Sequence, residues 1–345
     1  YELLSGLVGS EMCIRDSLGG PATEDIAKSW SEMQLLPADP RLREPRFQTG
    51  HMIAIYWETV ARWMNLRAER DALALRTPLI LIQAADEASP VMPIDIYKKL
   101  MNRANPKNTG GMHGMLEVHI GMRIRLLKAL AVDQGLVKDS EGVIVRVVPN
   151  PLDDVALTTA IESRERKIYL RHLPLGIWVR MDKFDGAAFT QDLQDADGGV
   201  DKHLTQSLVF IEPETTNALF TFQSNHVKYQ VKRTQFPISH GRVITSTACQ
   251  GRTMSEGVIV DCERYHTGPT PRKDEDWWLD LYVMLSRATR LEDLLLDRAP
   301  PIDFFQSGPP VSMRRQLAAF ARLSAACHTR AEEMAQELGF SRFFH

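Results

Sequence analysis

The order of apolar and polar runs between Phe236 and Arg290 constrains the fold of this 345-residue chain more than any other feature. The β-rich run FPISHGRVITSTACQG ends in a Gln-Gly turn, and the apolar strand GVIVDCE follows soon after it. A polar loop and a pair of tryptophans then lead to YVMLSRATRLEDLLL, which predicts a helix with Ser286 and Arg287 on its polar face. Buried strands that alternate with a helix in this way favour an α/β fold with a parallel sheet.

An earlier segment gives the same indication. Residues His51–Tyr56 predict a short buried strand, and Thr59–Leu73 predict a helix with one apolar side. The apolar run TPLILIQ predicts a second strand directly after this helix. A strand, a helix and a strand in close succession predict a parallel β-α-β unit.

The middle of the chain, from Met112 to about Phe222, predicts short strands joined by turns. Residues Asp139–Gly142 predict a hairpin turn, and the run DLQDADGGVDKH predicts an exposed loop. Several short strands in succession suggest a small barrel. Further strands are expected at Lys167–Leu170, Gly176–Met181, Leu208–Ile211 and Ala218–Phe222.

Two groups of charged residues in these segments have alternative interpretations. Arg123 and Arg125 are two residues apart and share one face of a strand, which is either a solvated outer face or a DNA contact. Asp86 and Glu87 follow an apolar strand, either as a Walker B pair that holds Mg²⁺ or as a loop-facing acidic pair. Asp261 also follows an apolar strand and raises the same question. A Walker B site works with a phosphate loop, and the sequence contains no GxxxxGK[ST].

Charge and cysteine usage narrow the class of protein. The formal net charge of −3 does not by itself indicate a nucleic-acid partner, so any DNA contact must come from local basic patches. The four cysteines are scattered without metal-ligand spacing, which favours a reducing compartment without a disulfide framework or a zinc site. Apolar runs such as Thr77–Ile82 are far shorter than the roughly 20 residues that cross a bilayer. We therefore expect a soluble intracellular protein without a membrane partner.

The two ends of the chain differ in character from the rest. Residues 1–17 resemble translated sequencing-adapter sequence, and the alternative is a disordered natural N-terminus. Two Pro pairs close the segment after Leu291. Residues Ser312–Gly339 then predict an amphipathic helix, which either docks on the body of the protein or binds a partner.

These patterns together resemble motifs IV, V and VI of superfamily 1 DNA helicases of the Pif-type and RecD-like branch. That branch reads approximately FPLxxAxTxHKSQGxT in motif V and YVALSRxxxLxxL in motif VI. The segment GMRIRLLKALAVDQGLVKDSEGVIVRV is similar to the family segment GAxVMLLKNLxxxxGLVNGxxGxV. The resemblance implies a second RecA-like motor domain, with a parallel sheet flanked by helices, interrupted by a β-rich, small-barrel-like insertion. It implies two halves at residues 18–112 and 236–300, the insertion at 113–235 and a helical tail at 301–345.

The resemblance also implies roles for individual residues. Arg287 corresponds to the arginine finger, a planar, permanently charged group that stabilises charge on a γ-phosphate. The residues implied near the nucleotide are Gln250, Gly251, Ser286 and Arg290. Those implied near DNA are Thr247, Arg252, Thr253 and, from motif IV, Thr59 and Asn65. The chain departs from the family where Thr247, Ala248 and Cys249 replace His-Lys-Ser, which removes two side chains suited to a phosphate contact.

The function implied is that of the C-terminal part of an ATP-dependent DNA helicase. Such a motor unwinds DNA 5′-to-3′ in repair, recombination or telomere maintenance, in the nucleus or an organelle. Its ATP and Mg²⁺ are held mainly by an N-terminal RecA-like domain, so we expect this chain alone to be inactive. The alternatives are a non-catalytic nucleic-acid-binding or interaction module and a transposon-borne helicase relic.

Overall fold

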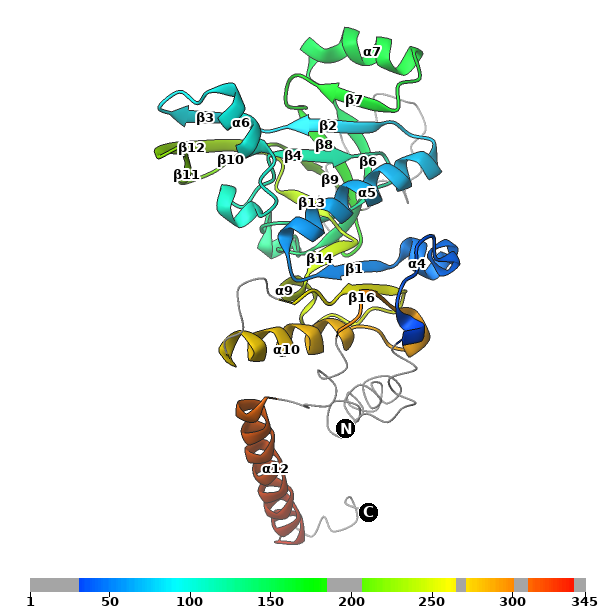
Figure 1. The fold of residues 1–345 in the computed structure, drawn as a ribbon, viewed down its shortest axis with the longest axis vertical. Helices are drawn as coiled ribbons and strands as arrows, with labels where there is room; N and C mark the ends of the chain where they lie inside the picture. Colours follow the sequence, from blue (N-terminus) through cyan, green and yellow to red (C-terminus); the bar gives the residue numbers. More distant parts are fainter. Residues whose placement is uncertain (1–30, 185–206, 265–270, 301–309, 338–345) are drawn as a thin grey trace. The chain divides into compact units, whose positions relative to one another are not determined.

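The computed structural model describes residues 31–184, 207–264, 271–300 and 310–337 (Figure 1). The chain divides into two compact units, one of residues Arg43–Gly251 and one that combines Tyr1–Leu42 with Arg252–His345. The predicted exposed loop at 192–203 and the adapter-like residues 1–17 lie outside the described residues. The division of the chain into motor halves and an insertion stays a prediction.

The predicted α/β class is confirmed by parallel strand pairs and the helices beside them. Strand β1 (His51–Ala54) pairs in parallel with β14 (Val243–Thr245), which lies far away in the sequence. Helix α5 (Trp57–Leu75) packs on both strands, and its buried residues include Val60, Trp63 and Ala68. The short helix α4 (Pro45–Thr49) precedes β1.

The predicted β-α-β unit is wrong in its second strand. Strand β2 (Leu79–Gln83) does form after α5, but it pairs in parallel with β7 (Lys167–Leu170) and antiparallel with β4 (Met115–Val118). It therefore belongs to a different sheet from β1. The residues Leu79–Ile82 are apolar and buried towards both faces, so they suit any interior sheet, and long-range pairing decides which one they join.

The β-rich middle of the chain contains a five-stranded antiparallel sheet in the order β13-β5-β6-β8-β9. Its inner face forms a large hydrophobic core together with residues of β2, β4 and β7. The strands predicted at Lys167–Leu170, Gly176–Met181 and Leu208–Ile211 have these bounds in the structure. Its small-barrel form stays a prediction. The sheet comprises β13 (Ile238–His240), β5 (Arg123–Leu126), β6 (Glu141–Val148), β8 (Gly176–Met181) and β9 (Leu208–Ile211).

The predicted hairpin between β5 and β6 exists, but its turn is longer than expected. Gly142 pairs with Ile124 inside the ladder, so residues Asp139–Gly142 do not make the whole turn. The chain instead makes an excursion through the 3₁₀ turn η3 (Val132–Gln134) and returns at Asp139. Asp139 takes a left-handed φ of 66°, a conformation that Asp tolerates better than most residues.

A smaller antiparallel sheet forms around β12 (Val227–Gln235). It has its own core, which includes Leu100, Phe222 and Val231. The strand expected at Ala218–Phe222 begins and ends two residues later. The partners of β12 are β3 (Ala85–Ser89), β10 (Glu214–Thr215) and β11 (Phe220–Ser224). Helix α6 (Ile94–Met101) and the turn η2 (Pro106–Thr109) follow β3 in the sequence.

The structure corrects two expectations about charged side chains in these two sheets. Asp86 lies on β3 with its side chain fully buried, where Arg233 binds both carboxylate oxygens at 2.8 and 2.7 Å, so it is not loop-facing. Arg125 is 3% exposed and pairs with Asp139 at 2.7 Å, so it does not belong to a solvated face. Burial requires a partner for each charge. The partner of Asp86 lies 147 residues away in the sequence, whereas that of Arg125 is only 14 residues away.

The other unit holds a second parallel pair, β15 (Val258–Asp261) with β16 (Leu294–Arg298). Helix α10 (Pro271–Leu285) is anchored by Trp277, whose indole N–H donates to the Glu263 carbonyl at 3.2 Å. The predicted tail helix is α12 (Val311–Glu337), and its apolar residues Phe320, Leu323 and Met334 are exposed. The short turns in these parts are η1 (Pro40–Arg43), η4 (Pro151–Asp153) and η5 (Leu291–Asp293), and helix α7 (Asp154–Glu162) follows η4 in the first unit.

Candidate functional site

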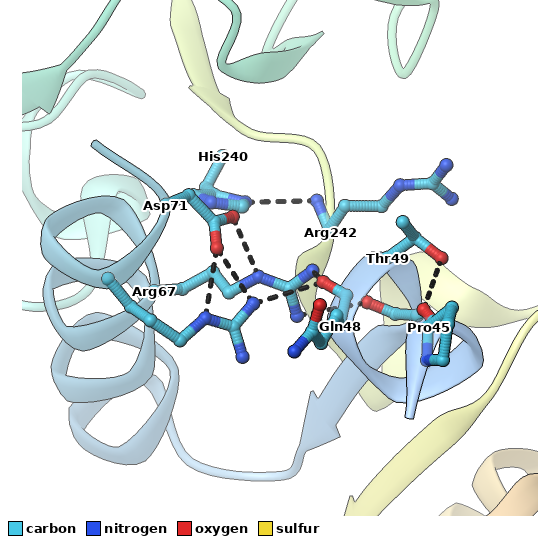
Figure 2. A network of polar contacts seen from close by, with 9 residues as sticks. Pro45, Gln48, Thr49, Arg67, Asp71, His240 and Arg242 are labelled. Atoms are coloured by element: carbon cyan, nitrogen blue, oxygen red, sulfur yellow. Dashed lines mark hydrogen bonds and ion pairs between the residues drawn. The ribbon is translucent and has the colours of Figure 1, made fainter. Parts of the chain in front are cut away.

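A buried polar network fixes the segment that leads to the Gln-Gly turn (Figure 2). Arg67 on α5 donates to Asp71 at 2.9 Å, to the Gly50 carbonyl at 3.2 Å and to the Gln48 carbonyl. Burial alone would raise the pKa of Asp71, but the guanidinium groups of Arg67 and Arg70 hold it below its ordinary value. The network therefore locks α5 against the residues that enter β1.

The same network continues to the residues that enter β14. The Arg242 amide donates to the His240 ring at 3.0 Å (Figure 2). The Arg242 guanidinium contacts the His51 ring at 3.2 Å. Because Nδ1 of His240 accepts that bond, the ring is held neutral on this side. Full burial lowers the pKa of His240 to about 3, and the nearby positive charge of Arg67 lowers it in the same direction.

Helix α9 (Ser246–Cys249) follows β14 and presents part of the predicted site to solvent. The Thr245 hydroxyl accepts a hydrogen bond from the Ala248 amide at 3.3 Å and caps this short helix. Thr247 and Gln250 are exposed, whereas Cys249 is buried and donates to the Ser246 carbonyl. Only one of the three positions that replace His-Lys-Ser, Thr247, is fully exposed to solvent.

Gly251 closes the Gln-Gly turn with a φ of +74°. A Cβ at this position would meet nothing within 4 Å. The requirement for glycine therefore comes from the left-handed backbone and not from crowding.

Arg287 lies in the turn that ends α10, which corrects the expected position of Ser286 and Arg287 on the helix itself. The helix ends at Leu285, and the Arg287 side chain folds back to cap it. Its Nε donates to the Val283 carbonyl at 2.7 Å and its Nη2 to the Ser286 hydroxyl at 2.7 Å. Arg290 consequently does not share a helix face with Arg287.

Arg287 also joins the two predicted motifs. Its Nη1 donates to the Arg252 carbonyl at 2.6 Å, and the Met254 amide donates to the Arg287 carbonyl at 3.0 Å. Arg252 directly follows the Gln-Gly turn in the chain. The structure therefore brings Arg252, Ser286 and Arg287 together, as contacts between two segments 35 residues apart.

The acceptors around Arg287 are all uncharged. Within the described residues, no carboxylate pairs with its guanidinium. Neutral acceptors fix the orientation of the group without cancelling its charge, and three of its five N–H donors are used. The half-buried guanidinium thus keeps a full positive charge and two donors for an anion.

The remaining predicted residues have diverse surroundings. Arg290 is exposed and contacts Glu292 at 3.5 Å, and Thr253 is also exposed. Thr59 is buried in the first turn of α5, whereas Asn65 is exposed on a different side of that helix. The structure does not bring Thr59 and Asn65 together.

The acidic residues after the apolar strands have protein partners. Asp261 is 1% exposed and accepts from Nε of Arg298 at 2.7 Å, as Asp86 does from Arg233. Across the described ranges, no group of three or more His, Cys, Asp or Glu side chains could hold a metal ion. The two carboxylates are thus each held by an arginine. None of the helices in the described part of the chain is long and apolar enough to cross a bilayer.

Sequence reasoning missed Arg67 and Asp71, which position the site without belonging to it, whereas Arg242 was considered only as a substitute for the lost DNA contact. The spacing of Arg67 and Asp71, four residues apart on a helix, was the available signal. The link from Arg242 to His51 had no local signal, because the two residues meet only through the pairing of β1 with β14.

No family model matches the sequence, and no curated protein matches it either. Among solved structures, Pif1 helicase from Bacteroides in complex with ADP-AlF3 and ssDNA aligns with a TM-score of 0.51 at 16% identity, over 92% of this chain and 54% of that chain. Pif1 helicase from Candida albicans aligns with a TM-score of 0.48 at 16% identity, over 91% and 57%. The chain spans about half the length of the solved helicases it matches. Its fold is similar to that of the Bacteroides Pif1 helicase.

Proposed function

We propose that this chain is the second RecA-like lobe of an ATP-dependent DNA helicase. In that arrangement an N-terminal RecA-like lobe supplies the phosphate loop and the Mg²⁺ carboxylates that this sequence lacks. The two halves of the lobe are residues 18–112 and 236–300, with the β-rich insertion between them. The whole motor couples ATP hydrolysis to 5′-to-3′ unwinding in DNA repair, recombination or telomere maintenance.

The observation that carries the proposal is the uncompensated charge of Arg287. An arginine finger must present a permanent positive charge to a γ-phosphate, and a carboxylate partner would cancel it. The three acceptors of Arg287 are two carbonyls and a hydroxyl, which orient the guanidinium and leave two N–H donors for phosphate oxygens. Bound ATP–Mg²⁺ supplies the phosphoryl group to be transferred.

The segment from Thr247 to Thr253 is the proposed link to DNA. Thr247, Gln250 and Thr253 are exposed, so their side chains are available to a phosphate. The Arg252 carbonyl holds Arg287, so a movement of this segment changes the position of the finger. The Bacteroides Pif1 structure in complex with ADP-AlF3 and ssDNA supports DNA as the partner of this fold.

The test begins with the transcript upstream of this chain. We expect a phosphate loop and a DE pair in the extension, and DNA-stimulated ATP hydrolysis by the extended protein. Arg287→Lys keeps a positive charge but loses the planar fork, so it should lower the turnover rate by about 10³-fold or more. Arg315→Lys, at an exposed position on α12, is the matched control and should have a much smaller effect.

Two results would overturn the proposal. Steady phosphate release by residues 18–345 with single-stranded DNA would show that no second lobe is needed. An upstream sequence without a phosphate loop, together with DNA binding by the chain, would favour the non-catalytic nucleic-acid-binding module.

A further inference from the structure

The outer face of the five-stranded sheet carries a row of three side chains on neighbouring strands. Arg146 of β6, Trp178 of β8 and Phe210 of β9 are direct partners across the two antiparallel ladders. Directly opposed side chains lie about 4.5–5.5 Å apart at Cβ and point to the same face. The strands β6, β8 and β9 lie side by side in Figure 1.

The two aromatic rings form a partly exposed pair. Their centroids are 4.9 Å apart with an interplanar angle of 47°, and neither residue is fully buried. The Phe210 ring lies over Gly176, where a Cβ would come within 2.0 Å of the ring. The glycine therefore allows the ring to lie close to the sheet.

Two arginines flank the aromatic pair. Arg180 is two residues after Trp178 on β8, so both side chains point to the same face, and Arg146 stands on the other side. Both arginines are exposed, and within the described residues neither guanidinium has a hydrogen bond or an ion pair. Val145, in the bulge beside Arg146, adds an exposed apolar side chain.

The acidic residues at the margins of this face do not neutralise these arginines. Glu141 and Asp182 lie towards one end of the sheet, where both pair with Arg123. Glu212 is exposed just after β9, near the opposite end. The centre of the face thus combines two aromatic rings with two uncompensated positive charges.

We propose that this face, named here the Trp178 platform, binds single-stranded nucleic acid through base stacking and phosphate contacts. Aromatic faces accept any base, and guanidinium groups bind phosphate oxygens in a bidentate manner. A protein partner would leave the two arginines without a stated acceptor, so the charges favour nucleic acid. The platform extends the proposed helicase function, because it adds a contact surface on the β-rich insertion, away from the Gln-Gly turn.

The experiment measures the affinity of the full chain for a fluorescein-labelled oligothymidylate by anisotropy. Trp178→Leu keeps an apolar side chain but loses the stacking face, so it should weaken binding by about 5- to 150-fold. Trp178→Phe should retain most of the affinity. Arg146→Gln with Arg180→Gln should make the slope of log affinity against log salt shallower by about 0.7 for each lost phosphate contact.

The controls separate a local role from a loss of folding. Arg164→Gln with Arg166→Gln, at two exposed arginines outside this face, should leave the affinity and its salt dependence unchanged. Thermal unfolding of each variant reports whether the fold is intact. A Trp178→Leu chain that is folded and binds the oligonucleotide as tightly as the parent would overturn the proposal and assign the face to a protein partner or to none.

A photoreactive amino acid at position 178 distinguishes this proposal from the proposed function. Crosslinking to the oligonucleotide, with no ATP hydrolysis by the extended protein, keeps the platform and rejects the motor lobe. Crosslinking from position 253 but not from position 178 rejects the platform and leaves the motor lobe standing.

Discussion

Arg233 and Arg287 are both held by three or more acceptors, but the acceptors differ in charge. Arg233 is fully buried, binds both oxygens of Asp86 and also donates to the Met112 carbonyl. Arg287 is half-buried and binds only carbonyl and hydroxyl oxygens. The positive charge of Arg233 is neutralised by Asp86, whereas the charge of Arg287 remains available to an anion. The number of hydrogen bonds alone therefore does not separate a structural arginine from a functional one.

The largest expected effect is on the rate of ATP hydrolysis, and it tests the charge of Arg287. In the extended protein, Arg287→Ala should lower the rate of DNA-stimulated ATP hydrolysis by about 10³- to 10⁵-fold, because the positive charge on the γ-phosphate is lost. Added guanidinium ion should restore part of the rate, since the site left by the side chain can accept it. Turnover measurements with and without millimolar guanidinium check both effects. If guanidinium does not restore the rate and the unfolding temperature of the variant is strongly lowered, Arg287 has a structural role like that of Arg233.

The next largest effect is on stability, and it tests the buried ion pair of Arg233 with Asp86. Arg233→Met leaves Asp86 buried without a partner and should lower the free energy of unfolding by about 3–5 kcal/mol. The double variant Asp86→Leu with Arg233→Met should recover most of that loss, because a matched apolar pair needs no compensation. Urea unfolding monitored by circular dichroism measures both. Equal stability of the single and double variants would contradict the pairing seen in the structure.

Acid sensitivity tests a third kind of site, the buried neutral histidines. Burial lowers the pKa of His113 and of His240 to about 3, well below the value near 6.5 of an exposed histidine. The unfolded chain therefore binds more protons between these values, and stability present above pH 6.5 is lost as the pH falls towards 3. Each histidine should contribute a slope of a little over 1 kcal/mol per pH unit in this window.

The measurement compares urea unfolding at pH 6.5 and pH 4.5 for the parent chain and for His240→Gln. The variant should lose less stability on acidification than the parent does, whatever its stability at pH 6.5. An identical loss in both proteins would show that His240 is already protonated or exposed in the folded state.

The smallest effect concerns the backbone next to the Arg252 carbonyl. Gly251→Ala places a Cβ in a left-handed conformation and should cost about 1–2 kcal/mol of stability, since the space around it is open. Gly111→Ala is the matched control, because it has a φ of +85° and equally open surroundings. If the two variants have similar free energies of unfolding and only Gly251→Ala lowers the rate of ATP hydrolysis, the turn has a role in positioning Arg287.

Local patterns predicted the elements well where burial alternates along a strand. Strands β7 and β8 have the expected bounds, and in both of them buried side chains alternate with more exposed ones, along Lys167–Leu170 and from Ile177 to Met181. The sheet that β2 joins could not be predicted, because its partners β4 and β7 are chosen by long-range packing. Likewise, the pairing of Asp86 with Arg233 spans 147 residues and has no local signal.

The residues of the candidate site could be selected from the family resemblance, but their arrangement in space was harder to predict. The resemblance selected Arg287 and Arg252, and the structure shows a hydrogen bond between them, but the roles of both residues stay predictions. The end of α10 was misplaced because the Arg287 side chain itself caps the helix, an effect that depends on rotamer and not on periodicity. The neutral character of its acceptors also required coordinates.

The parallel pairing of β1 with β14 has a consequence for biosynthesis. The strand His51–Ala54 leaves the ribosome long before its neighbour Val243–Thr245 has been translated. During this interval its edge and the apolar side of α5 lack their final partner, and such exposed surfaces promote aggregation. Slow steps in translation after residue 245, or a chaperone that holds the nascent chain until then, would therefore govern how much folded protein a cell obtains.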